Sequence, residues 1–194
     1  VKACALRYAP GKAVAAAAPL APDLAKETAT SIVVDTGALR FEVLKAGFDG
    51  IHQAWIDADG DGKVEEADPI LAADAVLSPY VVDQSGKVYT TRADAKPEVS
   101  VETSGPLMAC LRVAGWYVAT DGGRICRHVT RIQAYAGRSW VRVRHTFVFC
   151  ADSRETKIAD IAFPFGLGQA ARTVRFGGRP RDYTVPESRD LDAV

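Results

Sequence analysis

An acidic segment of the chain combines the residue types and the spacing of a calcium-binding loop. The stretch WIDADGDGKVEEAD, residues 55–68, places carboxylates at alternate positions and then a glycine, as an EF-hand-type loop does. Alternate short carboxylates can wrap a hard cation at about 2.4 Å, whereas without a cation their like charges repel each other. The spacing therefore predicts a structural Ca²⁺ site whose ligands are Asp57, Asp59, Asp61, the carbonyl of Lys63, Glu65 and Asp68.

The loop departs from the EF-hand pattern at its end. Asp68 stands where a glutamate usually closes the site, which shortens the last arm, and Pro69 discourages a helix that leaves the loop in register. We therefore expect the loop to connect strands instead of helices. The alternative interpretation is a solvated acidic turn that binds no metal.

Arginines and aromatic residues predict a second kind of site, for an acidic sugar. Residues 107–150 contain three long β-type runs, and pairing across the turn TDGG brings Arg112 near Arg131. Pairing across AGR brings Arg144 close to both, with Trp140 at the edge. Guanidinium groups match carboxylates, so these four residues are candidates for binding an acidic glycan. The alternative is that the arginines neutralise acids on the sheet face or simply solvate it.

The four cysteines are spread along the chain and form no CxxC pair, so a clustered zinc site is not expected. Cys126 and Cys150 fall on neighbouring strands, almost opposite each other in a register centred on residues 137–138. They predict a cross-strand disulfide, which would leave Cys4 and Cys110 as the second pair. Four buried thiols are the alternative.

The three histidines lack the spacing of a transition-metal site. His145 falls on the apolar stripe of its strand and is expected to be a hydrogen-bonded residue of the core. Cys126 and His128 share a strand face and form a weak candidate for a nucleophile pair, because neighbours on one strand do not establish catalytic geometry. No catalytic residue is assigned from the sequence.

Strand patterns must position all of these residues. SIVVD, residues 31–35, is a β-branched run, and ALRFEVL after it alternates so that Leu39, Phe41 and Val43 share one face. The runs LMACLRVAGWYVA, RICRHVTRIQAYA and SWVRVRHTFVF predict a three-stranded antiparallel meander. The predicted fold class is all-β, an antiparallel β-barrel or β-sandwich with this long meander and a calcium-type acidic loop.

Composition shifts divide the chain into three parts. Residues 1–30 are rich in Ala and Pro and predict an extended N-terminal segment. Residues 31–100 predict a small β-barrel-like part that contains the acidic loop, and residues 101–194 predict an antiparallel β-sandwich part.

The charge balance excludes some classes of partner. Lys plus Arg equals Asp plus Glu at 24 each, so the chain lacks the positive excess of a generic nucleic-acid binder. No apolar run reaches the roughly 18 residues that span a bilayer. The chain starts without a methionine or a signal peptide, so we expect a processed protein or a fragment of a longer one.

Three stretches within residues 31–150 carry a resemblance to a known family. VVDTGALRFEV, SGPLMACLRVAGWYV and VTRIQAYAGRSWVRVRHTFVF together resemble the non-catalytic β region of the exo-rhamnogalacturonan lyases, a family of polysaccharide lyases. In that family a small N-terminal β-barrel is followed by a central β-sandwich and a helical toroid. The resemblance implies an extracellular or periplasmic protein that handles glycans. The toroid bears much of the active-site cleft and is absent here, so no catalytic residue is transferred.

Two main function hypotheses follow from these patterns; a third, a free-standing enzyme, is the weakest because no acid/base constellation emerges from the sequence. The first is a calcium-stabilised, non-catalytic β module of a secreted lyase-like protein, which supports a missing catalytic domain or binds acidic polysaccharide. The second is a structural subunit of an extracellular assembly, a homo-oligomer in which residues 1–30 form an arm exchanged between subunits.

Overall fold

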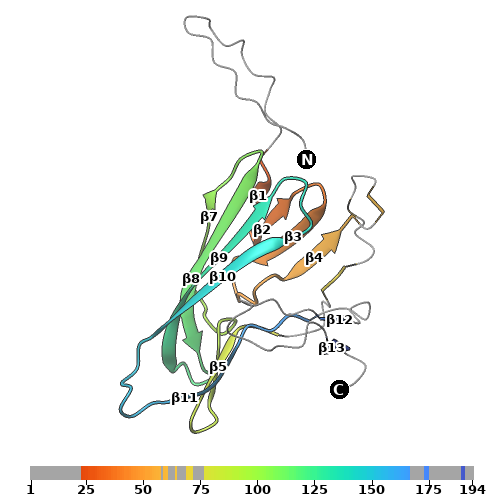
Figure 1. Ribbon diagram of the computed structural model, residues 1–194. Coiled ribbons are helices and arrows are strands. Elements are labelled where there is room, and N and C mark those ends of the chain that lie inside the picture. The colour runs from red at the N-terminus through yellow and green to blue at the C-terminus, as the bar shows by residue number, and fades with distance from the viewer. Residues whose placement is uncertain are drawn as a thin grey trace, which may run out of the picture.

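The computed structural model shows an all-β chain (Figure 1). Every regular element among the described residues is a strand, as the sequence predicts. The described part of the chain contains no helix long and apolar enough to cross a membrane. The predicted N-terminal arm lies largely outside the described part of the chain. The structure describes residues 23–57, 59–60, 64, 69–71 and 77–166, with the backbone of 173–174 and 189–190.

Four strands near the N-terminus form a small antiparallel sheet in the order β1-β2-β3-β4. The predicted SIVVD run is β2, and Leu39, Phe41 and Val43 of β3 are buried, as their alternation predicts. The bounds are Ala25–Glu27 for β1, Ser31–Asp35 for β2, Leu39–Leu44 for β3 and Gln53–Ile56 for β4.

A seven-stranded sheet makes up most of the remaining structure. Its strands run in the order β10-β9-β8-β6-β5-β11, and β7 also pairs with β8. β5 and β6 precede residue 100 and β8 follows it, so strands from both sides of the predicted division hydrogen-bond in one sheet. The bounds are Tyr80–Asp83 (β5), Val88–Thr90 (β6), Glu98–Thr103 (β7), Met108–Val118 (β8), Arg124–Tyr135 (β9), Val141–Phe149 (β10) and Ile158–Ala162 (β11); a separate pair is Thr173–Val174 (β12) and Arg189–Asp190 (β13).

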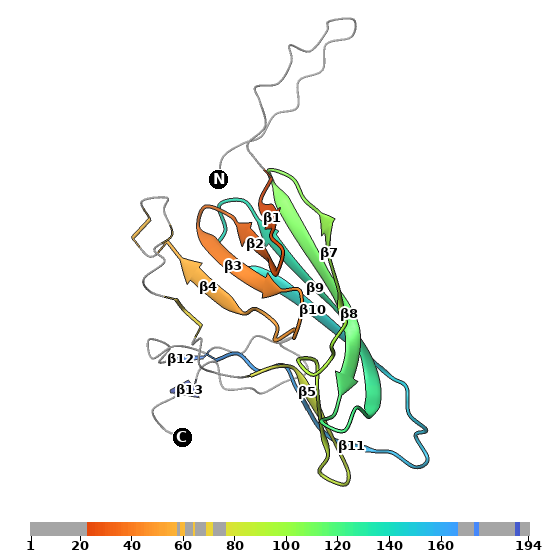
Figure 2. The same cartoon turned by 180° about the vertical axis from the view of Figure 1, so that it is seen from behind.

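The long strands β8, β9 and β10 form the predicted three-stranded meander. They lie side by side in both views of the molecule (Figures 1 and 2). Gly122 and Gly137 occupy the two turns with φ of 85° and 67°, a conformation that glycine adopts without steric cost. The turn chemistry therefore sets the register on which the candidate site depends.

The small sheet packs on the inner face of the long strands. Ile32, Val34 and Phe41 from the small sheet share one core with Leu111 and Ile132 from the large sheet, all of them buried. Burying each such side chain contributes about 1.5–3 kcal/mol, so this core is what makes the two sheets a sandwich. A second core, which includes Tyr117 and Ile125, lies where the large sheet curls toward β5 and β6.

The turns of the two sheets are also joined by hydrogen bonds. The backbone N–H of Gly137 donates to the carbonyl of Thr36 over 2.7 Å, and the Thr36 hydroxyl donates to the carbonyl of Arg138 over 2.8 Å. These bonds connect the β2–β3 turn with the β9–β10 turn. They hold one end of the sandwich closed, next to the start of β10.

Candidate functional site

The outer face of β7–β10 carries the predicted glycan-binding residues. Along each strand, successive side chains point to opposite faces, and Leu111 and Val113 of β8 with Ile132 of β9 face the small sheet, with which they share a core. The remaining positions face outward, away from the core. The side chains on this outer face, here called the arginine face, include Arg112, Arg127, Arg131, Arg142 and Arg144 with Glu98 and Glu102.

Three of these arginines form a row across three strands. Arg112 of β8 lies directly opposite Arg131 of β9, and Arg144 of β10 lies opposite Arg131 on its other side. Neighbouring strands are about 4.8 Å apart, so the row places three guanidinium stems at that spacing. The structure confirms the predicted juxtaposition of these three residues.

Two glutamates from β7 partly neutralise the row. Glu102 receives hydrogen bonds from both Nε and Nη2 of Arg131, at 2.7 and 2.8 Å, in a two-pronged ion pair. Glu98 accepts a longer bond of 3.4 Å from Arg112. The alternative interpretation, that sheet-face acids neutralise the arginines, therefore holds for these two residues.

The pKa values of the stronger pair move apart for the same reason. The hydrogen bond from Arg131 lowers the pKa of Glu102, and the bond to Glu102 raises the pKa of Arg131. Both side chains are more than one third exposed, at 35% for Glu102 and 41% for Arg131, so solvent screens much of the attraction. The pair orders the two side chains more than it stabilises the fold.

Positive charge remains at the β10 edge of this face. Arg142 and Arg144 are exposed, and neither forms an ion pair with another described residue. β10 is the terminal strand of its sheet, so nothing on that side of the described structure pairs with its backbone. An anion that approaches this edge meets guanidinium groups that carry no competing carboxylate.

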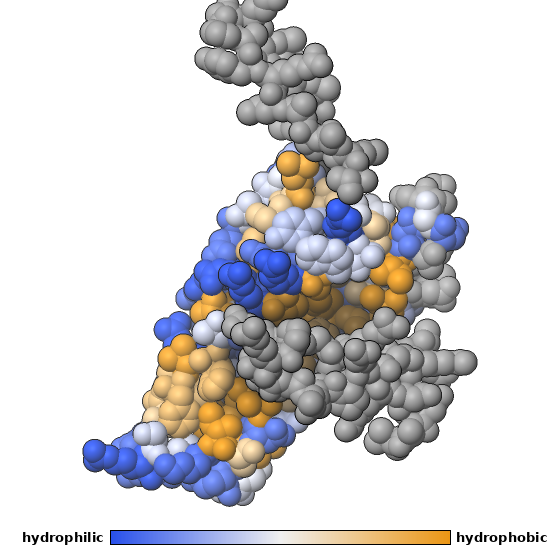
Figure 3. Space-filling model, viewed as in Figure 1, coloured by the Kyte–Doolittle hydropathy of each residue, from blue (hydrophilic) through white to orange (hydrophobic). Residues whose placement is uncertain are grey.

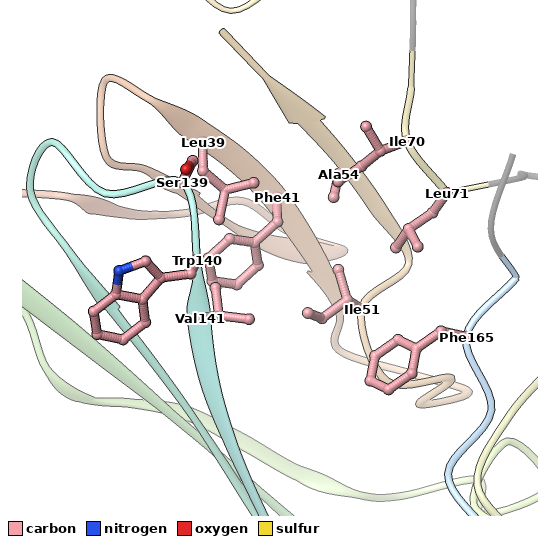
Figure 4. A pocket seen from close by; sticks show the side chains of 10 residues that line it. All are labelled: Leu39, Phe41, Ile51, Ala54, Ile70, Leu71, Ser139, Trp140, Val141 and Phe165. Carbon is pink, nitrogen blue, oxygen red and sulfur yellow. The ribbon is translucent and has the colours of Figure 1, made fainter. Parts of the chain in front are cut away.

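Aromatic rings lie next to these arginines. The indole of Trp140, which is 49% exposed, lies 5.3 Å from the ring of Tyr135, measured between centroids. Tyr135 points outward from β9, on the same face as Arg131. Figure 4 shows the indole of Trp140 directed away from the other labelled side chains, so it belongs to the arginine face more than to the cleft behind it.

Trp116 is another aromatic residue on the arginine face, and arginines of this chain cover its ring. The guanidinium groups of Arg124 and Arg127 each lie 5.5 Å from the ring centroid of Trp116. Such contacts contribute about 0.5–1 kcal/mol each at exposed sites. Because its ring is already covered by two arginines, Trp116 is less suited than Trp140 to stack on a sugar.

An apolar cleft opens on the other side of the β10 edge, between the two sheets. It encloses about 240 Å³, and Figure 3 shows hydrophobic residues gathered in this hollow. Phe41 and Ile51 line it from the small sheet and Val141 from β10 (Figure 4). The polar groups needed to orient a small ligand are scarce there, because Ser139 is the only polar residue among the lining residues described.

Only two of the six predicted calcium ligands, Asp57 and Asp59, lie among the described residues; Asp61, Lys63, Glu65 and Asp68 lie outside them. Asp57 comes directly after β4, and its carboxylate accepts a hydrogen bond of 2.7 Å from the N–H of Gly60. Beyond the loop, Ile70 donates to the carbonyl of Ala54 in β4 over 2.8 Å. Asp57 and Ile70, on either side of the acidic stretch in the sequence, thus both adjoin β4, and the loop between strands stays a prediction.

The predicted disulfide between Cys126 and Cys150 is wrong for this structure, where both thiols are free. The register pairs Cys126 with Phe149, so Cys150 lies one position beyond the pairing partner. A one-residue offset turns side chains to opposite faces, and Cys126 is buried while Cys150 is exposed. Cys110 is also free and buried, and Cys4 lies outside the described residues.

The structure also brings together a buried polar cluster that strand patterns predict only in part. His145, expected to be a hydrogen-bonded core residue, contacts Tyr117 at 2.5 Å and Thr130 at 2.7 Å. His128, which is 1% exposed, contacts Thr130 at 3.3 Å. Alternation alone indicates that His128, Thr130 and His145 share the inner face, but no motif links them to Tyr117.

The fold and these surfaces define a β-sandwich domain with a cationic outer face. A family model, the PcRGLX-like protein central beta sandwich domain, matches residues 24–190. The chain belongs to this rhamnogalacturonan lyase-like family, in which it represents the central β-sandwich. The resemblance stated from the sequence is therefore confirmed for that domain. No curated protein matches the chain.

Proposed function

We propose that this chain is a non-catalytic β-sandwich module that supports the catalytic domain of a secreted lyase-like protein and holds acidic glycan on its arginine face. The observation that carries the glycan-binding part is the row formed by Arg112, Arg131 and Arg144. On the same face, the arginines outnumber the two glutamates Glu98 and Glu102, so the described side chains leave an excess of positive charge.

The β10 edge is the part of the face best suited to a uronate. Arg144 and Arg142 are free to form two-pronged bonds with a carboxylate, which is the geometry that guanidinium groups favour. The adjacent rings of Tyr135 and Trp140 supply flat apolar surfaces against which a sugar ring can stack. Arg131 contributes less, because Glu102 already occupies its donors.

Calcium belongs to the same proposal as a structural ion. The alternating acids begin at Asp57, directly after β4, and Ile70, which follows them in the sequence, donates a hydrogen bond to Ala54 of β4. An ion held there would stabilise this segment, which belongs to a different part of the sequence from the strands of the arginine face. Its role would be in stability and not in contact with glycan.

Retention on immobilised polymers tests the glycan-binding proposal. The full chain should be retained by a uronate polymer and not by a neutral polymer of similar length, and added salt should weaken the retention because charges carry it. Equal retention on both polymers, or none on either, would remove the support for a glycan-binding face. Size-exclusion chromatography at several concentrations distinguishes the alternative, a self-assembling structural subunit, which should elute earlier as concentration rises.

A further inference from the structure

A buried histidine, a half-buried histidine, a threonine and a tyrosine form one hydrogen-bonded chain across three strands. His128 Nδ1 lies 3.3 Å from Thr130 Oγ1, which lies 2.7 Å from His145 Nδ1. His145 Nε2 lies 2.5 Å from the hydroxyl of Tyr117. We call these four residues the histidine relay. Tyr117, Thr130 and His128 are essentially inaccessible to solvent, at 0%, 0% and 1% exposure.

One arrangement of protons leaves the fewest of these groups unpaired. In it, Tyr117 donates to His145 Nε2, His145 Nδ1–H donates to Thr130, and Thr130 donates to His128 Nδ1. Only the remaining N–H, at His128 Nε2, then has no acceptor among the described residues. In the reverse arrangement, the hydroxyl proton of Tyr117 has no acceptor and the unprotonated Nε2 of His128 has no donor among the described residues. Both histidines are neutral in the favoured arrangement.

The relay sits where three separate segments meet. Phe48, which follows β3 of the small sheet, stacks on His128 with centroids 5.6 Å apart and planes 9° apart. Phe163, which follows β11, packs edge to face with the His145 ring, with centroids 5.1 Å apart and planes at 73°. The two imidazoles stack on each other at 5.6 Å. The relay is therefore the polar part of the contact between the long strands and both flanking segments.

Few charges are available to stabilise a proton on the relay. Asp94 favours a proton on His128, and Asp94 Oδ2 and His128 Nε2 both lie beside Gly115, where an added Cβ would meet them at 2.6 and 3.0 Å. The Asp94 carboxylate is already occupied, since it accepts hydrogen bonds from the backbone N–H groups of Trp116 and Lys96. Arg127 and the partner imidazole both oppose a charge on His128. For His145, burial alone shifts the pKa, and no charged neighbour contributes to the shift.

We propose that the histidine relay is an acid-sensitive latch, which holds Phe48 and Phe163 against the long strands while both imidazoles are neutral and releases them when the imidazoles are protonated. A proton on His145 deprives Tyr117 of its acceptor. A proton on His128 in addition places two like charges in rings whose centroids are 5.6 Å apart, in a partly buried site. Phe48 and Phe163 then separate from the imidazoles, because a charge held between apolar rings is costly until water or a counter-ion solvates it.

The pKa shifts agree with this geometry and define the pH window. Burial lowers the pKa of His128 and of His145 from 6.5 to about 4 in each case. The open or unfolded state therefore binds more protons than the closed state between pH 6.5 and pH 4. Stability is fully present above pH 6.5 and is lost as pH falls through this window. From pH 7 to pH 5, each imidazole raises the opening equilibrium by roughly 20-fold.

Nuclear magnetic resonance of the imidazoles tests the latch in the unmodified chain. The ring signals of His128 and His145 should show neutral tautomers at pH 7 and should not titrate near pH 6.5. Hydrogen exchange, corrected for its intrinsic pH dependence, should accelerate at least tenfold from pH 7 to pH 5 in peptides that contain Phe48 or Phe163. Titration of both rings with ordinary pKa values and no change in exchange would overturn the proposal.

A variant and a matched control separate the latch from general acid unfolding. His145→Gln retains a hydrogen-bonding side chain but cannot be protonated. The increase in its unfolding constant between pH 7 and pH 5 should therefore be roughly 20-fold smaller than that of the parent chain. His52→Gln removes the third histidine, which pairs with Asp49 outside the relay, and should leave the latch signals of His128 and His145 unchanged. If His145→Gln loses as much stability in acid as the parent chain does, the relay is not the sensor.

Discussion

Arg112 lies directly opposite Arg131 on the neighbouring antiparallel strand, and neither charge is buried. Like charges at directly opposed positions destabilise a sheet unless acids accompany them. Glu98 and Glu102 supply those acids from β7, the strand that pairs with β8 on the side opposite β9. The face is therefore neutralised on its β7 side and remains cationic on its β10 side.

The position of Glu102 leads to a prediction about affinity. Replacing Glu102 with Gln removes a negative charge and one of the two oxygens that accept hydrogen bonds from Arg131, so at least one donor of Arg131 is released. We expect the variant to bind a uronate polymer about three- to tenfold more tightly, which corresponds to roughly 0.7–1.4 kcal/mol. Isothermal titration at low salt measures the change. Glu155→Gln, which alters an exposed acid away from this face, is the control and should bind as the parent does.

Unchanged or weaker binding by Glu102→Gln would mean that the arginine row does not contact the polymer. The stability of the variant provides a check on this interpretation. Because the Arg131–Glu102 pair is exposed and screened by solvent, its loss should leave the denaturant midpoint of unfolding nearly unchanged. A clearly lower midpoint would point to a structural role for the pair.

Gly115 should tolerate no side chain. A Cβ at this position would meet Asp94 Oδ2 at 2.6 Å and His128 Nε2 at 3.0 Å, and both groups are buried. Gly115→Ala should therefore lower the free energy of unfolding by about 1–3 kcal/mol through overpacking. Gly105→Ala is a matched control, since an added Cβ there meets nothing within 4 Å, and it should change stability by less than about 0.5 kcal/mol. Denaturant titration of both variants compares them, and equal effects would contradict the close approach.

The acidic loop predicts a calcium-dependent melting temperature. Calcium at about 100 times its dissociation constant stabilises a folded chain by roughly 2.7 kcal/mol, or about 5–10 °C for a domain of this size. Differential scanning calorimetry with calcium and with chelator measures the shift. Asp59→Asn together with Asp61→Asn should reduce it strongly, whereas Glu155→Gln should not. A melting curve that is the same with calcium and with chelator rules out a structural ion in solution.

The thiols should differ in reactivity according to burial. Cys150 is exposed, whereas burial raises the pKa of Cys126 to about 11 and also raises the pKa of Cys110. In a Cys4→Ser background at pH 8, we expect one thiol to react rapidly with a disulfide reagent and two to react only after unfolding. Peptide mapping should place the fast label on Cys150. Rapid labelling of Cys126 would contradict the buried inner-face position.

The strand patterns account for most of the fold and for the arginine row. The turns TDGG and AGR join runs of strong β propensity, so the registers that place Arg112, Arg131 and Arg144 in one row follow from turn length and alternation. The same register should also have excluded the disulfide. The residue opposite Cys126 is Phe149, so Cys150 lies one position past the paired residue. An offset of one residue is enough to reverse the direction of the side chain.

Other features depend on contacts that no local pattern encodes. Phe48, Asp94 and Phe163 come from irregular segments, yet they enclose the histidine relay from three sides. The glutamates of β7 were visible in the sequence, but their partners depend on β7 pairing with β8 across a bulge. Tertiary packing, and not residue period, decides which polar groups meet in such places.

Binding of the Arg142→Gln, Arg144→Gln double variant to a uronate polymer tests the central proposal most directly. Both residues are exposed at the β10 edge, so the variant should keep its melting temperature within about 2 °C, as is usual for surface substitutions. We predict at least a tenfold loss of affinity, with no loss for Arg154→Gln, an exposed arginine away from the face. If the double variant binds the polymer as tightly as the parent chain, the arginine face does not hold acidic glycan.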